Sequence, residues 1–234
     1  MSAQYPKLIL PKGYLSWSQI TCWINSRQRY INEYFEDGKK LDTKYLRFGS
    51  QFSKMVEDLC ELMERIPDRH LAVQELRKTH PMDENMESVM MELDIEGVSE
   101  YEINCTVRGM VPVRAYLDKY VTRNGAIQEY KTGLSPWTMA KVQKHDQLLV
   151  YGVALKWCGK PIPPYADLHW IETRELEEER KDFWRDGAKI ITATGRIKTF
   201  HREFDEREFE RMEEVIVRVA TEISDAYQEH LSNL

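Results

Sequence analysis

The chain has 234 residues, of which 42% are hydrophobic and 31% are charged, and its formal net charge is −6 at pH 7. This composition is typical of a folded protein and excludes an intrinsically disordered one, and the length predicts a single α/β domain over residues 1–234. The negative charge argues mildly against a protein that coats nucleic acid by bulk charge, although it leaves room for a local basic groove.

No stretch of the sequence approaches the roughly 20 apolar residues that cross a membrane, and no apolar segment follows Met1 as a secretory signal requires. We therefore expect a cytoplasmic protein with no membrane partner. The four cysteines are scattered singly along the chain, which argues against a disulfide framework or a zinc site and suits a reducing compartment. They are Cys22, Cys60, Cys105 and Cys158.

Two amphipathic helices are predicted before residue 66. Ser16 and Gln19 form a capping-box pattern at the start of the first helix, which is predicted over residues 16–35. Apolar residues at helical spacing place the second helix at residues 50–65.

Residues 67–98 are expected to be mostly irregular, with short helices near residues 71–78 and 85–93. Four methionines lie between positions 82 and 91 in this stretch. Because methionine adapts to irregular gaps in a core, we interpret them as core packing and not as a metal or redox site.

Three consecutive strands are predicted in the middle of the chain. Residues 100–108 form the first strand, and residues 113–121 alternate as a half-buried second strand. Asn124-Gly125 is typical of a two-residue type I′ turn, from which residues 126–131 return as the third strand.

A long helix is predicted next, over residues 135–157, because Ser135 and Pro136 are favourable N-cap and first-turn residues. Residues 166–172 are predicted to form a further strand. The charged stretch that follows, residues 175–185, is interpreted as a solvated helix face.

The chain is predicted to end with a strand and a helix. Residues 190–203 have strand character that is broken at Gly195, and Asp205 with Glu208 caps a long C-terminal helix. Together these elements predict an α/β fold with a mixed central sheet and helices on both faces.

Asp118, Glu129 and Lys131 are the candidate site residues of the predicted hairpin. A two-residue turn would place Asp118 opposite Lys131, and alternation would direct Glu129 to the same face of the sheet. Two carboxylates and an ammonium group are sufficient to hold a divalent cation and a polarised water. The hairpin alone is equally compatible with a solvated sheet face that carries an Asp118–Lys131 ion pair.

Further motifs surround this hairpin in a definite order. Asp118 is followed by Glu129-Tyr130-Lys131-Thr132-Gly133 and then by a helix that carries Gln147 and Tyr151; segments 15–20 and 48–57 precede them. In order and spacing the set resembles the PD-(D/E)XK nuclease superfamily, and within it the RecB-type exonuclease domains of bacteria and phages. The resemblance covers about residues 15–155 and implies a restriction-endonuclease-like core.

Two positions depart from the family pattern. Ser53 stands where the family usually has a histidine that binds metal, and Ser26 stands where the iron–sulfur branch of the family has a cysteine. Because a cluster needs four thiolates at characteristic spacings, we expect no iron–sulfur cluster in this protein.

The resemblance implies a metal-dependent DNA nuclease that hydrolyses phosphodiester bonds, namely an exonuclease of DNA recombination, DNA repair or phage DNA processing in a bacterial or phage-infected cell. The expected cofactor is Mg²⁺, with Mn²⁺ as a substitute, and the expected partners are DNA and a recombination or replication protein. The alternative is a catalytically silent member of the same fold that binds DNA or protein, which the missing histidine suggests.

The resemblance also implies roles for individual residues. Asp118 and Glu129, with the backbone carbonyl of Tyr130, are expected to bind the metal ion. Lys131 is expected to act on the attacking water, either as a general base or as an electrostatic stabiliser. Glu57 lies four residues after Ser53 and is predicted to replace the missing histidine as a ligand, the alternative being a surface residue or salt-bridge partner.

Four residues are predicted to contact the substrate or a metal-bound water. Gln147 and Tyr151 lie one helical turn apart, and Ser53 is expected at most to hydrogen-bond a metal-bound water. Lys144 belongs to a predicted basic patch around the acidic residues. The other members of that patch are Lys119, Arg123, Lys131 and Lys141.

Overall fold

A five-stranded mixed sheet organises the computed structural model, which describes residues 8–36, 38–39, 42–176 and 190–234. The strands lie in the order β1-β2-β3-β4-β5. β3 and β4 are parallel, whereas the other neighbouring pairs are antiparallel. The bounds are Val98–Val107 for β1, Val111–Val121 for β2, Ala126–Gly133 for β3, Tyr165–Leu176 for β4 and Ile190–Glu203 for β5.

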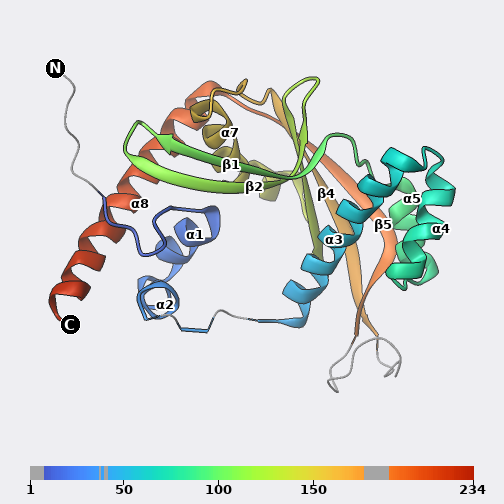
Figure 1. Cartoon of the computed structure of the whole chain (residues 1–234), viewed down its shortest axis with the longest axis horizontal. Coiled ribbons are helices and arrows are strands. Elements are labelled where there is room, and N and C mark those ends of the chain that lie inside the picture. The colour runs from blue at the N-terminus through green and yellow to red at the C-terminus, as the bar shows by residue number, and fades with distance from the viewer. Residues whose placement is uncertain (1–7, 37, 40–41, 177–189) are drawn as a thin grey trace.

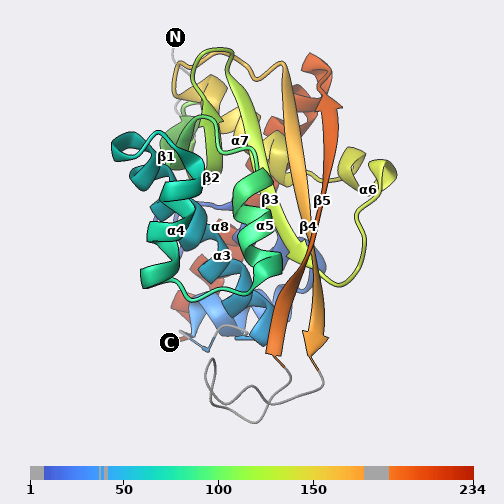
Figure 2. The ribbon, with the colours of Figure 1, turned by 90° about the vertical axis from the view of Figure 1, so that its right-hand side faces the viewer.

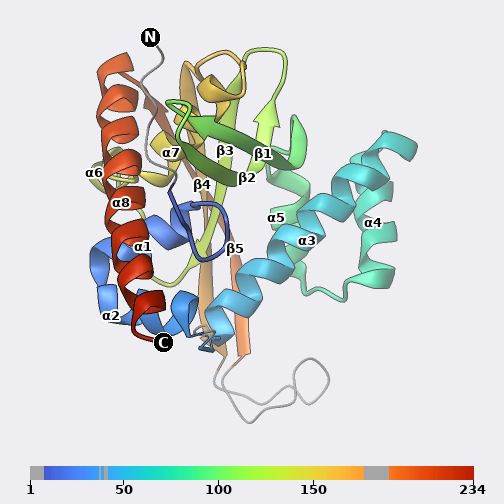
Figure 3. The ribbon, with the colours of Figure 1, turned by 60° about the vertical axis from the view of Figure 1, so that its left-hand side comes forward.

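One face of the sheet is covered by α1 (Trp17–Asn25), α7 (Gln147–Trp157) and α8 (Glu206–Ser232), which Figure 3 shows on one side of the strands. Side chains from these helices and from β1, β2 and β3 form one hydrophobic core. Fully buried members of this core include Leu15, Ile20, Leu117, Ile127, Leu148 and Ile216.

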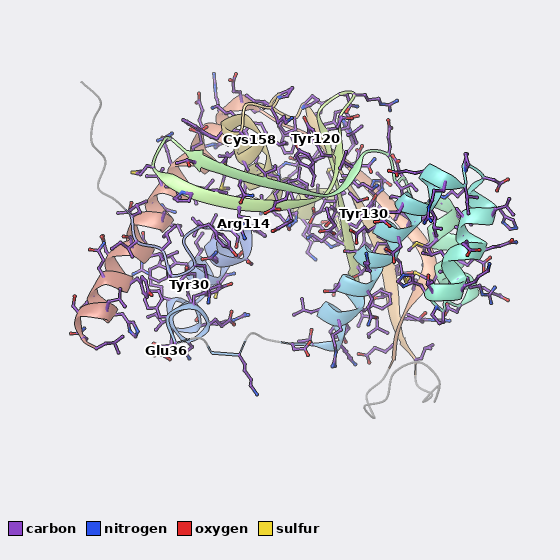
Figure 4. All side chains as sticks on the ribbon, in the orientation of Figure 1. Tyr30, Glu36, Arg114, Tyr120, Tyr130 and Cys158 are labelled. Carbon is purple, nitrogen blue, oxygen red and sulfur yellow. The ribbon has the colours of Figure 1, made fainter. Side chains whose placement is uncertain are left out.

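The opposite face is covered by α3 (Lys44–Arg65), α4 (Arg69–Thr79) and α5 (Glu84–Glu92), which stand in front of the strands in Figure 2. Met82, Met86 and Met90 are buried in this second core, so the interpretation of the methionines as core packing is confirmed. Tyr130 of β3 faces this side and lies beside α3 in Figure 4. The fold class predicted from the sequence, a mixed sheet between two layers of helices, is thus confirmed (Figure 1).

The turn between β2 and β3 is longer than predicted. Val121 pairs with Ala126, so residues 122–125 form a four-residue turn and the predicted register is wrong by two residues. A type I′ turn needs a positive φ at both central residues, and only Gly125, at +75°, has one. Asn124 instead accepts a hydrogen bond from the N–H of Ala126 through its side chain, at 3.0 Å.

β2 and β3 separate soon after this turn, so the sheet forks. Lys119 and Gln128 form the last pair between the two strands. Further along, β2 pairs with β1 on one side, while Leu15 occupies its other side. The N–H of Leu15 donates to the carbonyl of Pro112 at 2.8 Å, and the N–H of Arg114 donates to the carbonyl of Leu15 at 2.9 Å.

The predicted first helix is broken near Ser26, which has an extended backbone (φ −161°). The helix continues as the short α2 (Arg27–Tyr30) and a π-helical turn, η1 (Ile31–Phe35). The Ser26 hydroxyl accepts from the N–H of Arg29, so this serine caps a new helix and ends the old one. The predicted capping box at Ser16 is wrong, because its hydroxyl contacts Ser18 and caps no helical N–H.

Two other helix boundaries differ from the predictions because a threonine acts as the N-cap. α3 begins at Lys44, with the Thr43 hydroxyl accepting from the N–H of Leu46. The predicted helix over residues 135–157 is two helices, α6 (Met139–Gln143), which is capped by Thr138, and α7.

The later elements agree more closely with the sequence. Asp205 and Glu208 form the predicted capping box of α8, and Gly195 has a φ of +85° within β5, where the pairing with β4 shifts register near Ile171. The predicted charged helix over residues 175–185 is wrong at its start, since residues 175–176 belong to β4, and its remainder lies outside the described residues. No helix among the described residues is long and apolar enough to cross a membrane.

Candidate active site

Asp118, Glu129 and Lys131 come together where β2 and β3 separate. The observed register brings Asp118 level with Glu129. The predicted register was wrong by two residues, but a shift of two keeps each side chain on the same face of the sheet, so Asp118, Glu129 and Lys131 still share one face. The carboxylate of Asp118 accepts a hydrogen bond from the backbone N–H of Tyr130 at 2.7 Å, in place of a strand-to-strand bond. Lys131 donates to Oε1 of Glu129 at 2.5 Å. The alternative interpretation of the hairpin paired Lys131 with Asp118, and the structure pairs it with Glu129.

Glu129 has an unusual environment for a carboxyl group. Its side chain is 1% exposed, and its Oε2 atom is buried with no hydrogen-bond partner among the described residues. Burial and the nearby charge of Asp118 raise the pKa of Glu129 to about 8, although Lys131 opposes this shift. A buried carboxyl oxygen without a donor is a position that a bound cation would satisfy, so Asp118 and Glu129 fit the oxygen-rich coordination that Mg²⁺ prefers.

Lys131 is held in place by groups from two elements. It donates to Glu129 within β3 and to the side-chain oxygen of Gln147 in α7, the latter at 2.9 Å. Burial disfavours the ammonium form, but the charges of Glu129 and Asp118 outweigh it and raise the pKa of Lys131 above its usual range. The ammonium group is therefore held between Glu129 of β3 and Gln147 of α7.

Tyr151 supports this arrangement from within α7. The side-chain amide of Gln147 donates to the Tyr151 hydroxyl, while the tyrosine itself is buried. Burial, followed by the charges of Glu129 and Asp118, raises the pKa of Tyr151 well above its usual value, so the hydroxyl stays protonated. Gln147 is half-buried and faces Lys131, whereas Tyr151 acts on the site through Gln147.

α3 lies against the end of β3 and presents Ser53 and Glu57 on the turns that follow Gly49. A Cβ at Gly49 would lie 3.5 Å from the hydroxyl of Thr132, so α3 is in van der Waals reach of β3. Glu57 forms a salt bridge with Lys54 at 2.7 Å. This agrees with the alternative interpretation of Glu57 as a salt-bridge partner. Within the described chain no three His, Cys, Asp or Glu side chains have a metal-binding arrangement, so Glu57 does not join Asp118 and Glu129 here, and its role as a ligand stays a prediction.

Glu100 of β1 is a charged neighbour that sequence reasoning missed. It has a left-handed backbone (φ +44°), and the pair that it would form with Asp118 is absent from the β1–β2 register. Desolvation by its neighbours, followed by the charges of Asp118 and Glu57, raises the pKa of Glu100, although its side chain is exposed, and this places its carboxylate near both. Glu100 is a neighbour of Asp118 only because of the pairing between β1 and β2, and no sequence motif marks Glu100 as a site residue.

The predicted basic patch is only partly formed. Lys119 is fully buried on the opposite face, where its ammonium group lies 2.8 Å from the Cys60 sulfur and 3.2 Å from the Gly97 carbonyl. Arg123 forms an ion pair with Glu96 at 2.8 Å. Including Lys119 in the patch was therefore wrong, because adjacent strand residues point to opposite faces and Lys119 follows Asp118 directly. Lys141 and Lys144 are exposed near α6.

No protein-family model matches the chain, and no curated protein matches its sequence. Solved structures are similar in fold. A candidate exonuclease from Eubacterium rectale superposes with a TM-score of 0.51 at 10% identity, over 91% of this chain and 83% of the other. A phage-related exonuclease from Haemophilus somnus 129PT gives a TM-score of 0.44 at 14% identity, over 95% of this chain and 86% of the other. At 10% identity, the likeness to the Eubacterium rectale protein shows a shared fold and no more.

Proposed function

We propose that this protein is a metal-dependent nuclease that hydrolyses phosphodiester bonds in DNA, and that it acts as an exonuclease. The observation that carries the proposal is the buried Oε2 of Glu129 beside Asp118, which has no hydrogen-bond partner among the described residues, with Lys131 hydrogen-bonded to Glu129 and Gln147. The fold shared with a candidate exonuclease supports the same reading. The role in recombination, repair or phage DNA processing and the partner protein rest on the sequence resemblance.

The residues divide the chemistry between them. Asp118 and Glu129, with the Tyr130 carbonyl, would hold Mg²⁺, which when bound lowers the pKa of a water and neutralises charge on the phosphate. Lys131, whose ammonium group is held by Glu129 and Gln147, would stabilise the negative charge that develops on the phosphate or orient the attacking water. Gln147 keeps that group in place, and Tyr151 keeps Gln147 in place.

The silent-module alternative starts from Ser53 in place of histidine. It is disfavoured because a binding module has no use for two crowded carboxylates with a raised Glu129 pKa, an arrangement that costs stability. Such costs are typical of catalytic sites.

The test is incubation of the purified protein with linear duplex, closed circular duplex and single-stranded DNA, with Mg²⁺, Mn²⁺ or EDTA. We expect linear DNA to be degraded from its ends with either metal, closed circles to persist and EDTA to stop the reaction. Cleavage in EDTA, or none with either metal, would contradict the nuclease proposal. Cutting of closed circles would contradict the exonuclease assignment alone.

A further inference from the structure

An aromatic cluster lies next to the catalytic residues. The His145 ring packs edge-on against Trp137, with ring centroids 4.9 Å apart, and against Trp17 of α1, at 6.3 Å. His145 is two residues from Gln147, which holds Lys131. Burial, followed by the charges of Lys131 and Arg202, lowers the pKa of His145 to about 3, so its ring is uncharged in neutral solution.

Trp137 is the half-exposed member of this cluster. It packs at the edge of a small core whose members, including Trp170 and Phe200, are buried. The Trp170 indole donates to the Gly133 carbonyl at 3.3 Å, which ties this core to the end of the catalytic strand. The segment around Trp137 also exposes two large apolar side chains, Leu134 at 42% and Met139 at 44%. Figure 2 shows α6 standing away from the body of the molecule beside β5.

Three lysines border this cluster. Lys141 lies over the Trp137 ring at 5.0 Å from its centroid, and Lys198 lies over the Phe200 ring at 4.9 Å. Among the described residues neither of them, nor Lys144, forms a salt bridge. These cations stand out in a chain with a net charge of −6, because a cation left without an anion marks a position where a phosphate would be favoured.

A groove of about 430 Å³ continues from Trp17 along α1. Its wall carries short polar side chains, Ser18, Thr21 and Asn25, which are among the groups that bind the sugar-phosphate backbone of nucleic acids. Trp17 thus lies between this groove and the cluster around Trp137.

We propose that Leu134, Trp137, Met139, Lys141, Lys144 and Lys198 form a single-strand-binding surface, on which one unpaired base of the substrate stacks against Trp137 and the lysines bind flanking phosphates. The proposal rests on the proposed function and narrows its substrate to DNA whose cut strand is unpaired beside the site. A half-exposed aromatic ring bordered by cations suits a single strand, because stacking needs a base that is free of its duplex.

Binding to fluorescently labelled oligothymidine and to a blunt duplex, measured by anisotropy in EDTA, tests the surface without cleavage. Stacking on an aromatic side chain contributes about 1–3 kcal/mol per base, so Trp137→Ala should weaken single-strand binding about fivefold or more. Trp137→Phe should retain most of the affinity. Trp157→Ala is the matched control, since Trp157 is 38% exposed at the far end of α7, and it should leave binding unchanged.

Two results would overturn the proposal. One is wild-type single-strand affinity in a Trp137→Ala protein whose circular dichroism is native. The other is an equal loss of affinity for the blunt duplex and the single strand. If Trp137→Ala does not fold, the exposed double variant Lys141→Ala/Lys144→Ala decides the matter, and it should weaken single-strand binding severalfold. If single-strand binding depends on Trp137 but the wild-type protein cleaves no DNA, only the proposed function is refuted. If Trp137→Ala cleaves DNA at the wild-type rate, only the binding surface is refuted.

Discussion

Asp118 has two roles. Its negative charge contributes to the candidate site, and its carboxylate accepts a hydrogen bond from the Tyr130 N–H, which stabilises the fold. Asp118→Asn removes the charge but can keep an acceptor, whereas Asp118→Ala removes both. We expect both variants to lose DNA cleavage, as should Glu129→Gln and Lys131→Ala. Of the two Asp118 variants, only Asp118→Ala should also lose stability, by about 1–2 kcal/mol, because it leaves a backbone N–H without a partner. Urea unfolding and cleavage assays measure the two effects, and wild-type cleavage by any of the four would refute the role given to that residue.

Glu57 allows a second test at the same scale. If the Glu57 carboxylate leaves Lys54 and binds the metal ion instead, Glu57→Gln should raise the Mg²⁺ concentration needed for half-maximal cleavage. Ser53→Ala should change that concentration much less. Cleavage rates across an Mg²⁺ titration give the comparison. An unchanged midpoint in Glu57→Gln would leave Glu57 as the salt-bridge partner that the structure records.

The three central residues could be predicted from the sequence, but their contacts could not. Alternation along β2 and β3 groups Asp118, Glu129 and Lys131 under the predicted register and under the observed one, because the two differ by an even number of residues. The bond from Asp118 to the Tyr130 N–H depends on the separation of the strands. The left-handed Glu100 depends on tertiary pairing, which local patterns do not encode.

At the scale of elements, α7 and α8 meet at Gly152. A Cβ at this position would lie 2.2 Å from Cε1 of Phe209, whose buried ring has no room to move. Gly152→Ala should therefore destabilise the protein by about 1–3 kcal/mol. Gly49→Ala is the matched control in α3, where a Cβ would meet ordinary contacts and the higher helix propensity of alanine should leave stability equal or slightly greater. Thermal unfolding of both variants makes the comparison, and equal losses would contradict it.

Glu213 of α8 joins α8 to the β1–β2 turn and to α7. It forms salt bridges with Arg108 at 3.1 Å and Lys156 at 2.8 Å. Although burial favours the neutral acid, hydrogen bonds from Lys156, Arg108 and Trp157 hold the pKa of Glu213 below its usual range. The stabilisation is therefore complete above the unfolded value of about 4.3 and is lost as the pH falls through the lower folded value.

Glu213→Gln tests this linkage. The variant should be less stable than wild type by about 1–3 kcal/mol at pH 7, and the difference should shrink as the pH falls below about 4. Chemical unfolding at several pH values measures it. A difference that does not change with pH would show that packing, and not charge, explains the loss.

Helix and strand identities were mostly predictable, and most errors arose at helix starts. Ser26, Thr43 and Thr138 each act as an N-cap, and each begins a helix where periodicity alone gave another boundary. Asp205 and Glu208 were recognised because the reciprocal capping box has a two-residue signature. A lone hydroxyl residue has no such signature, because it occurs as often in loops.

At the scale of the whole molecule, the net charge of −6 and the local lysines act in opposite senses on nucleic-acid binding. If Lys141, Lys144 and Lys198 contact three phosphates, the logarithm of the affinity for single-stranded DNA should fall with the logarithm of salt concentration with a slope of about −2. Lys198→Ala should reduce this slope by about 0.7. Titrations between about 50 and 200 mM salt measure it, and a slope near zero would exclude the three contacts.

The fork in the sheet also bears on which metal ion the site would accept. Asp118 stands on one branch and Glu129 on the other, so the separation of the two carboxylates follows how far the branches open. Mg²⁺ needs ligands at about 2.0–2.1 Å, whereas Ca²⁺ accepts about 2.3–2.6 Å. Leu15, which pairs along the open edge of β2, and Lys119, at the last pair before the fork, both lie away from the carboxylates. Ion selectivity could thus be retuned from these two buried positions without altering a ligand.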